Sequence, residues 1–233
     1  MNKTIRGLFL TGLFAATALG QASAQAPAPA ETKEAAYTRT ITERAAKIVA
    51  KIDGLKDKDS VLVRDLIADQ YRQLNDIYEQ QKTRKAALKA QPATDATKAE
   101  LARVDADTEA ALAKLHPQYL KKLSRRLTPA QIEQVKDGMT YGVLPLTMTA
   151  YNDMLPNLTA EQRAQMLAWL TEAREHAMDG GTSEQKHAWF GKYKGRINNY
   201  LSAAGIDMNQ AGKDWQARIA ARKAAGAGTP APQ

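Results

Sequence analysis

Three Thr-x-x-Gln segments, at residues 128–131, 159–162 and 182–185, restrict the fold of this chain more than any other feature. In a capping box, the threonine hydroxyl accepts a hydrogen bond from the backbone N–H three residues later, and the glutamine side chain bonds the threonine N–H. Pro129 occupies the first helical position of the first segment, where an N–H is not needed. Three helix starts are therefore predicted. No stretch alternates apolar and polar residues over the length of a strand, so the sequence predicts an all-α protein.

The first half of the chain has the periodicity of a helical hairpin. A first helix is predicted over residues 33–52, with isoleucines on one stripe, and Gly54 closes it. Two further helices, one beginning near Ser60 and one after the turn at residues 91–94, repeat apolar residues at seven-residue spacing. A short link between such helices favours antiparallel packing. Pro117 is expected to kink the second of them.

The second half of the chain, residues 127–223, is predicted to be helical and to pack on the hairpin half, residues 33–126, within a single helical domain. Residues 138–156 are apolar, rich in methionine and interrupted by glycine and proline, which predicts a short broken helix or a loop in the core. A last helix is expected over residues 209–222, with Trp215 facing inward.

The two ends of the chain differ in composition from this domain. Residues 1–24 have the charged start, the apolar stretch and the Ala-Ser-Ala end of a secretory signal peptide cleaved after Ala24. Residues 25–32 are a Pro/Ala-rich linker, and residues 224–233 are predicted to be a disordered tail. The apolar stretch is too short for a membrane anchor and no second one follows. We therefore expect an exported, periplasmic protein without a transmembrane segment.

Charge and cysteine content narrow the classes of partner. The formal net charge is +8, and removal of the signal peptide leaves 31 basic and 25 acidic side chains, a net charge of +6. The cations are spread along the chain, which is typical of solvated helix faces, and they are compatible with acidic polysaccharides or an anionic membrane surface. Nucleic acid is not expected as a partner of an exported protein. The absence of cysteine excludes thiol nucleophiles, thiolate zinc sites and thiol redox chemistry. No Gly-rich phosphate loop or nucleophile elbow is present, and no cofactor is predicted.

The segment of most unusual composition is residues 186–202, KHAWFGKYKGRINNYLS. On a helix, its aromatic residues share one broad face, and a narrow polar stripe runs along the edge of that face. Rings beside fixed polar groups suit a carbohydrate, because rings cover the apolar face of a sugar and polar groups bond its hydroxyls. The structural alternative is that the aromatics are core and that Gly191 and Gly195 admit a crossing helix. The predicted ligand-binding residues are Trp189, Tyr193 and Tyr200 for stacking and His187, Lys194, Arg196 and Asn198 for polar contacts.

A second polar cluster consists of Glu172, Glu175, His176 and Asp179. A histidine beside carboxylates can act as an acid/base group or as half of a metal site. The apolar side of the same helix, which includes Met166, lies opposite, and this favours a solvated face with ordinary i, i+4 pairs. A hydrolase or lyase using His176 with Glu172 or Glu175 is therefore the weakest functional alternative, and no metal site is predicted.

Two segments resemble a motif of known chaperones. LTPAQ at residues 127–131 and LTAEQ at residues 158–162 are similar to the LTxxQ motif of the Spy and CpxP periplasmic chaperones. The resemblance implies a chaperone or stress-interaction protein that binds other proteins, and this is the main alternative function. The capping box explains each motif equally well.

A second resemblance covers nearly all of the chain between the linker and the tail. The segments RDLIADQYRQLNDIY, VKDGMTYGVLP, WLTEAREHAMD and HAWFGKYKGRINNYLSAAG resemble the family of domains of unknown function numbered 3826. The resemblance implies an exported protein of polysaccharide-degrading bacteria with a sugar ligand, and it implies no catalytic residues. The leading hypothesis is therefore a non-enzymatic, exported helical protein that binds a carbohydrate-related ligand.

Overall fold

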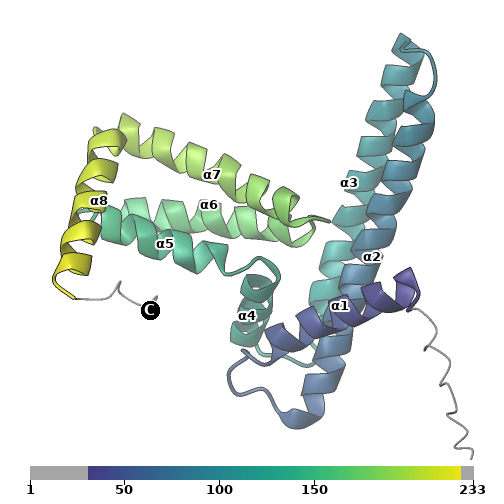
Figure 1. Cartoon of the computed structure of the whole chain (residues 1–233), viewed down its shortest axis with the longest axis horizontal. Helices are drawn as coiled ribbons and strands as arrows, with labels where there is room; N and C mark the ends of the chain where they lie inside the picture. The colour runs from purple at the N-terminus through teal and green to yellow at the C-terminus, as the bar shows by residue number, and fades with distance from the viewer. Residues whose placement is uncertain (1–30, 227–233) are drawn as a thin grey trace, which may run out of the picture. The chain divides into compact units, whose positions relative to one another are not determined.

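A computed structural model describes residues 31–226, and over this range all regular structure is helical (Figure 1). The all-α prediction is confirmed. The predicted signal peptide lies outside the described residues, as do most of the predicted linker and tail. Within residues 31–226, no helix combines the length and the apolar character needed to cross a membrane. The helices of this range are α1 (Lys33–Val49), α2 (Asp57–Lys89), α3 (Asp95–Leu123), α4 (Pro129–Met139), α5 (Val143–Met154), α6 (Ala160–Met178), α7 (Ser183–Ala203) and α8 (Met208–Ala224).

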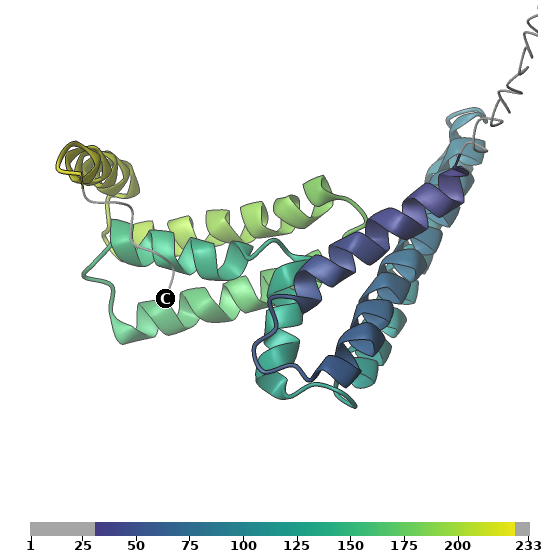
Figure 2. The ribbon, with the colours of Figure 1, turned by 60° about the horizontal axis from the view of Figure 1, so that its bottom comes forward.

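The predicted hairpin is formed by α2 and α3, and α1 packs along α2 (Figure 2). Gly54, which follows α1, has a positive φ of 65°, a conformation that glycine adopts without strain. Pro117 lies inside α3, which continues to Leu123, so the proline does not end the helix. A first hydrophobic core joins these helices to α4, and its buried members include Ile41, Ala45, Ile48, Val63, Ile67, Tyr119, Leu123, Val135 and Met139.

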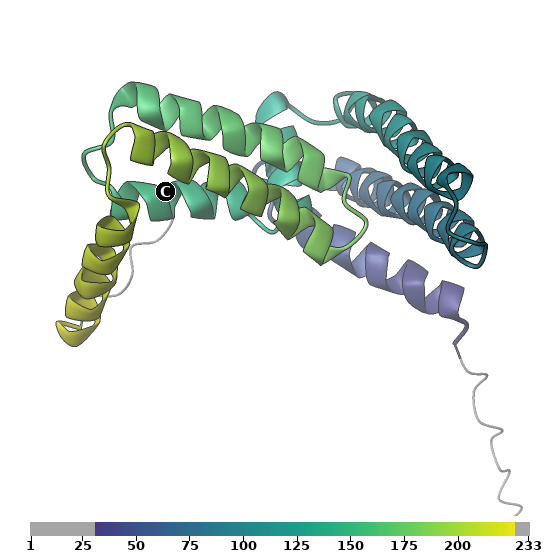
Figure 3. The same cartoon turned by 90° about the horizontal axis from the view of Figure 1, so that it is seen from above.

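A second hydrophobic core lies among α5, α6 and α7, where α6 and α7 run side by side (Figure 3). The connection between α6 and α7 contains Gly180 and Gly181, and Lys186 of α7 folds back over it. The Lys186 ammonium donates to the carbonyls of Ala177 and Met178, both at 3.0 Å, and so satisfies the carboxyl end of α6. The buried members of this core include Leu144, Leu158, Met166, Leu170, Ala173, Phe190, Ile197 and Leu201.

All three Thr-x-x-Gln segments form capping boxes. Thr128, Thr159 and Thr182 are the N-caps of α4, α6 and α7, and each accepts from the N–H of the glutamine three residues later. Leu127 and Leu158, which precede two of these caps, are buried. Both LTxxQ segments therefore form helix starts.

The apolar segment that follows α4 is more regular than predicted. Tyr141 and Gly142 both have positive φ, and this left-handed pair ends α4 and starts α5. Pro145 lies in the first turn of α5, where the missing N–H has no intrahelical acceptor. Residues 143–154 therefore form one unbroken helix, and the prediction of a loop or broken helix was wrong for this stretch.

Candidate functional site

The predicted ligand-binding residues lie on three faces of α7. The middle face is buried in the second core and includes Tyr193, whose side chain is 6% exposed. On one flank are His187, Lys194 and Asn198, all exposed. On the opposite flank are Trp189, Arg196 and Tyr200. The structure therefore does not gather the seven residues around one point, but it does bring three of them together.

His187, Lys194 and Asn198 line a pocket between α5, α7 and α8, which we call the α7 pocket. Its volume of about 530 Å³ is within the range of small-molecule sites. The walls are mostly apolar, and polar side chains are few, which is the usual composition of a ligand site. The other lining residues are Val143, Leu146, Thr147, Ala150, Tyr151, Met154, Met208, Asn209 and Trp215.

Several polar groups of the α7 pocket have no protein partner within residues 31–226. Neither the Lys194 ammonium nor the His187 imidazole makes a hydrogen bond or ion pair with a described residue. Asn198 is held by one contact only: the Tyr151 hydroxyl donates to its Oδ1 at 2.6 Å. Burial raises the pKa of Tyr151 to about 12, so this hydroxyl stays a donor. The Asn198 amide N–H groups are thereby left as donors to a ligand.

The outer wall of the α7 pocket is α8, and the Asp153 carboxylate accepts hydrogen bonds from two of its side chains. The Trp215 indole N–H donates to Asp153 at 2.6 Å, and the Arg222 guanidinium donates to the same carboxylate at 2.6 and 3.0 Å. Arg218 donates to the backbone carbonyl of Asp153. The hydrogen bonds from Arg222 and Trp215 lower the pKa of Asp153 to about 2. We call these four residues the Asp153 cluster. It holds Trp215, which the sequence predicted to face inward, against α5, where the half-buried indole lines the pocket.

Tyr141 lies beside the α7 pocket, in contact with its lining residue His187. Its φ of 61° is unusual for a residue with a side chain, and its ring is 45% exposed. The ring stacks on His187 with centroids 5.5 Å apart and an interplanar angle of 15°. Backbone strain of this kind is common at binding sites, where it fixes the direction of a side chain.

The opposite flank of α7 differs, because its side chains already pair with other protein groups. Trp189 stacks on His176 at 4.3 Å. The Arg196 guanidinium lies 4.4 Å from the ring centre of Trp169, and Tyr200 meets the same indole edge-on at 5.3 Å. These contacts tie α7 to α6, so this part of the predicted set has a structural role.

A larger cleft, of about 660 Å³, lies between the α2–α3 hairpin and the α6–α7 pair. Most of its ionisable groups are paired with one another. The His116 imidazole contacts Asp179 at 2.9 Å and Glu175 at 3.2 Å, and Tyr78 donates to the Asp179 carbonyl. Asp105 is paired with Lys85. This cleft therefore offers a ligand fewer free donors than its size suggests.

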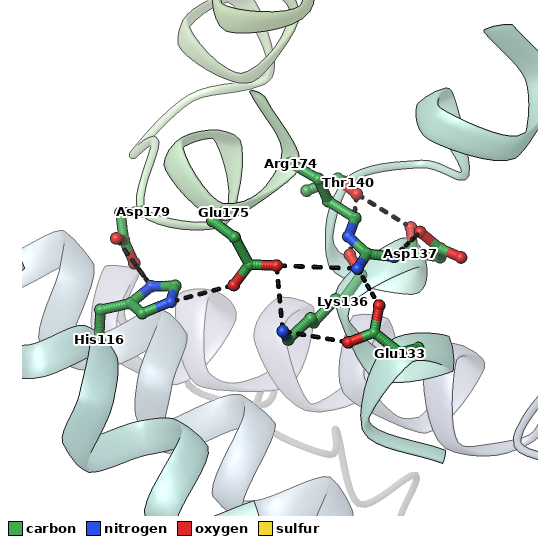
Figure 4. Close-up of polar contacts among 8 residues, drawn as sticks. All are labelled: His116, Glu133, Lys136, Asp137, Thr140, Arg174, Glu175 and Asp179. Carbon is green, nitrogen blue, oxygen red and sulfur yellow. Dashed lines mark hydrogen bonds and ion pairs between the residues drawn. The ribbon is translucent and has the colours of Figure 1, made fainter. Parts of the chain in front are cut away.

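Behind His116, a chain of charges continues from α3 through α6 to α4 (Figure 4). Lys136 bonds Glu175 at 3.0 Å, and Arg174 bonds Glu133 and, at 2.7 Å, Asp137. Arg174 is only 3% exposed. We call His116, Glu133, Lys136, Asp137, Arg174, Glu175 and Asp179 the charge network.

The charge network fixes the protonation states of its central pair. Hydrogen bonds to Asp179 and Glu175 raise the pKa of His116 to about 9, so the imidazole is protonated at neutral pH. Burial acts to raise the pKa of Glu175, but hydrogen bonds from His116 and Lys136 outweigh it and lower the pKa to about 2. A carboxylate this acidic is a structural anion and does not suit a general acid.

The prediction of a solvated face for the second polar cluster was wrong for Glu175 and Asp179. Both bond His116, 59 and 63 residues earlier in the chain. Glu172 and His176 are exposed, in line with the prediction, and His176 stacks on Trp189. The sequence signal that could have revealed the network is His116 itself, a histidine placed before Pro117 in a helix otherwise patterned for packing.

Comparison with known proteins identifies the family. Residues 38–221 match the family described as protein of unknown function DUF3826. The chain belongs to this family. The match covers α2 to α7 completely, and so includes both the α7 pocket and the charge network. No curated protein matches the sequence significantly.

Proposed function

We propose that this member of the DUF3826 family binds a carbohydrate in the α7 pocket. The observation that supports the proposal is the combination of apolar walls with polar side chains that lack protein partners among the described residues. His187, Lys194 and the amide N–H groups of Asn198 provide these groups, and all three residues belong to the set predicted from the sequence.

The chemistry of the α7 pocket suits a sugar ring. The Trp215 indole and the Tyr141–His187 stack offer flat surfaces for the C–H face of a ring. The Lys194 ammonium and the Asn198 amide donate hydrogen bonds, and hydroxyl groups of a sugar can accept them. Trp215 takes the stacking role that the sequence hypothesis gave to Trp189, because Trp189 lies on the other flank of α7 and is already stacked.

The first test uses thermal shift and calorimetry to measure the binding of neutral and acidic oligosaccharides to the purified protein. For a sugar that binds, we expect Lys194→Ala and His187→Ala each to weaken affinity by about tenfold, the size of one or two lost hydrogen bonds. Asn199→Ala is the matched control, because Asn199 is exposed on the same helix and lines neither cavity.

A second comparison separates the two flanks of α7. Arg196→Ala changes the flank that faces Trp169 and is expected to leave affinity unchanged. If Arg196→Ala abolished sugar binding while Lys194→Ala had no effect, the ligand would occupy the opposite flank and the proposed pocket would be wrong. Absence of binding across a diverse oligosaccharide panel would contradict the carbohydrate proposal itself.

A further inference from the structure

A second, smaller cavity lies beside the α7 pocket and has a different character. Its volume of about 90 Å³ matches the liquid volume of about three water molecules, which is too small for a sugar ring. It is lined from α1, α2, the α6–α7 connection and α7, and the residues that matter for its chemistry are Tyr37, Arg44, Tyr71, Tyr141, Thr182 and Lys186.

The charged side chains that line this cavity, within the described part of the chain, are Arg44 and Lys186, and both are cations. The Arg44 guanidinium lies 5.4 Å from the ring centre of Tyr71 and makes no hydrogen bond or ion pair with a residue in the range 31–226. Five N–H donors in a fixed planar fork are therefore free, and this geometry matches a carboxylate or sulfate.

Lys186 supplies a second cation from inside the molecule. Its side chain is 3% exposed, and two of its three N–H donors bond the carbonyls of Ala177 and Met178. Burial lowers the pKa of Lys186 to about 8, the charge of Asp179 opposes this change, and the nearby charge of Arg44 adds to it. An anion in the cavity would offset the repulsion between the two cations.

The first turn of α7 also makes the cavity favourable for a negative charge, but more weakly than the two cations do. Thr182 and Ser183 line the cavity at the amino end of a 21-residue helix, where the backbone dipoles favour negative charge. This feature supports the assignment, which depends on the buried Lys186 and the unpaired Arg44.

The two cavities are neighbours through one pair of rings. Tyr141 lines the small cavity, His187 lines the α7 pocket, and their rings are stacked. His187 also follows Lys186 directly in the chain. A substituent on a sugar held against this stack is therefore close to the cationic cavity.

We infer that the small cavity binds an oxyanion, a carboxylate or a sulfate ester, carried by the carbohydrate that occupies the α7 pocket. This inference rests on the proposed function and adds the ligand class: an acidic sugar. Arg44 binds the oxyanion with paired N–H donors, and Lys186 provides a second cation from inside the molecule. The Tyr141 side chain separates the sugar ring from the oxyanion.

The test compares galacturonic acid oligosaccharides with galactose oligosaccharides of equal length, which differ in a carboxylate. We expect tighter binding of the acidic series, and we expect Arg44→Gln to remove that preference, about a tenfold change for a lost charge-assisted pair. Arg44 is exposed, so we expect this variant to fold normally, which circular dichroism checks. Lys186→Met is a second variant, with circular dichroism to confirm its fold, and Arg39→Gln on the same helix is the matched control.

The outcomes separate the two proposals. If Lys194→Ala weakens both series but the acidic series has no advantage, the α7 pocket stands and the oxyanion site is overturned. If Arg44→Gln leaves an acidic preference intact, the oxyanion site is likewise overturned. If sodium sulfate binds in an Arg44-dependent manner while no oligosaccharide binds, the oxyanion site stands and the carbohydrate proposal falls.

Discussion

The α7 pocket and the charge network use polar side chains in opposite ways. In the network, His116, Glu175 and Arg174 all bond other protein groups across three helices. In the pocket, Lys194 and His187 make no such bonds with described residues. Paired charges stabilise an arrangement of helices, whereas the exposed donors of the pocket bond no described protein group and are available to a ligand. The larger cleft is therefore the weaker candidate site.

Among the substitutions that test this distinction, one at Arg174 is expected to have the largest effect on stability. Arg174→Leu removes the buried cation that pairs with Glu133 and Asp137. We expect the free energy of unfolding to fall by about 3 kcal/mol, because the two carboxylates lose the ion pairs that offset their desolvation. Urea denaturation measures it. Arg103→Leu, at a guanidinium that is 71% exposed, is the control and should change stability by less than about 0.5 kcal/mol. Equal effects of the two substitutions on stability would contradict a structural role for the charge network.

The next effect is a pH dependence carried by His116. Its pKa is raised from 6.5 to about 9, so its stabilisation is complete below pH 6.5 and is lost as the pH rises through 9. Allowing for partial exposure, we expect a loss of about 2 kcal/mol over this interval. Lys186 has the opposite effect on stability. Because folding lowers its pKa to about 8, the destabilisation caused by burying its charge decreases as the pH rises above 8.

The measurement is denaturant unfolding of the protein and of His116→Gln between pH 6 and pH 10. Because Lys186 is present in both, the difference between the two curves isolates His116. The difference should shrink steadily toward pH 10, and a difference that stays constant with pH would show that folding does not raise the pKa of His116.

A smaller effect is expected where the α7 pocket meets the second core. Tyr151→Phe removes the hydroxyl that bonds Asn198 and should cost about 1 kcal/mol of stability. A double-mutant cycle with Asn198→Ala measures the coupling directly, with an expected value of similar size. A coupling near zero would mean that this bond does not orient Asn198.

The smallest stability effect is expected at the unpaired donors. Lys194→Ala and His187→Ala should change the free energy of unfolding by no more than about 0.5 kcal/mol, since neither side chain makes a hydrogen bond or ion pair with a described residue. A loss of 2 kcal/mol in either variant, measured by the same urea titration, would place that side chain among the structural contacts and weaken its assignment to a ligand.

The features that were predictable from the sequence are local ones. Capping boxes involve residues three apart, so Thr128, Thr159 and Thr182 could be placed at helix starts without tertiary information. The stripe formed by Ile41, Ala45 and Ile48 follows from helical periodicity alone. The helical wheel of α7 likewise separated the stripe of His187, Lys194 and Asn198 from the aromatic face.

The features that were missed depend on which helix covers which face. Glu175 lies opposite the apolar side of α6, and it becomes a paired, partly buried anion only because α3 and α4 approach its side of the helix. The same holds for Trp215, whose role as a pocket wall requires the bond to Asp153 on another helix. Helical periodicity gives the direction of a side chain but not its neighbour, so two flanks of α7 were merged into one predicted site.

The attachment of α8 has a kinetic consequence. Within the described residues, α8 contributes no buried side chain, and the Asp153 cluster is its main polar connection to the rest of the fold. A helix with so little buried surface separates at a small fraction of the free energy of global unfolding. Because α8 also forms one wall of the α7 pocket, its departure would open the pocket and remove the partly buried Met208 and Ala211 from the edge of the second core. For a ligand bound as proposed, the residence time would depend on how often Asp153 releases Trp215 and Arg222, as well as on the contacts of the ligand.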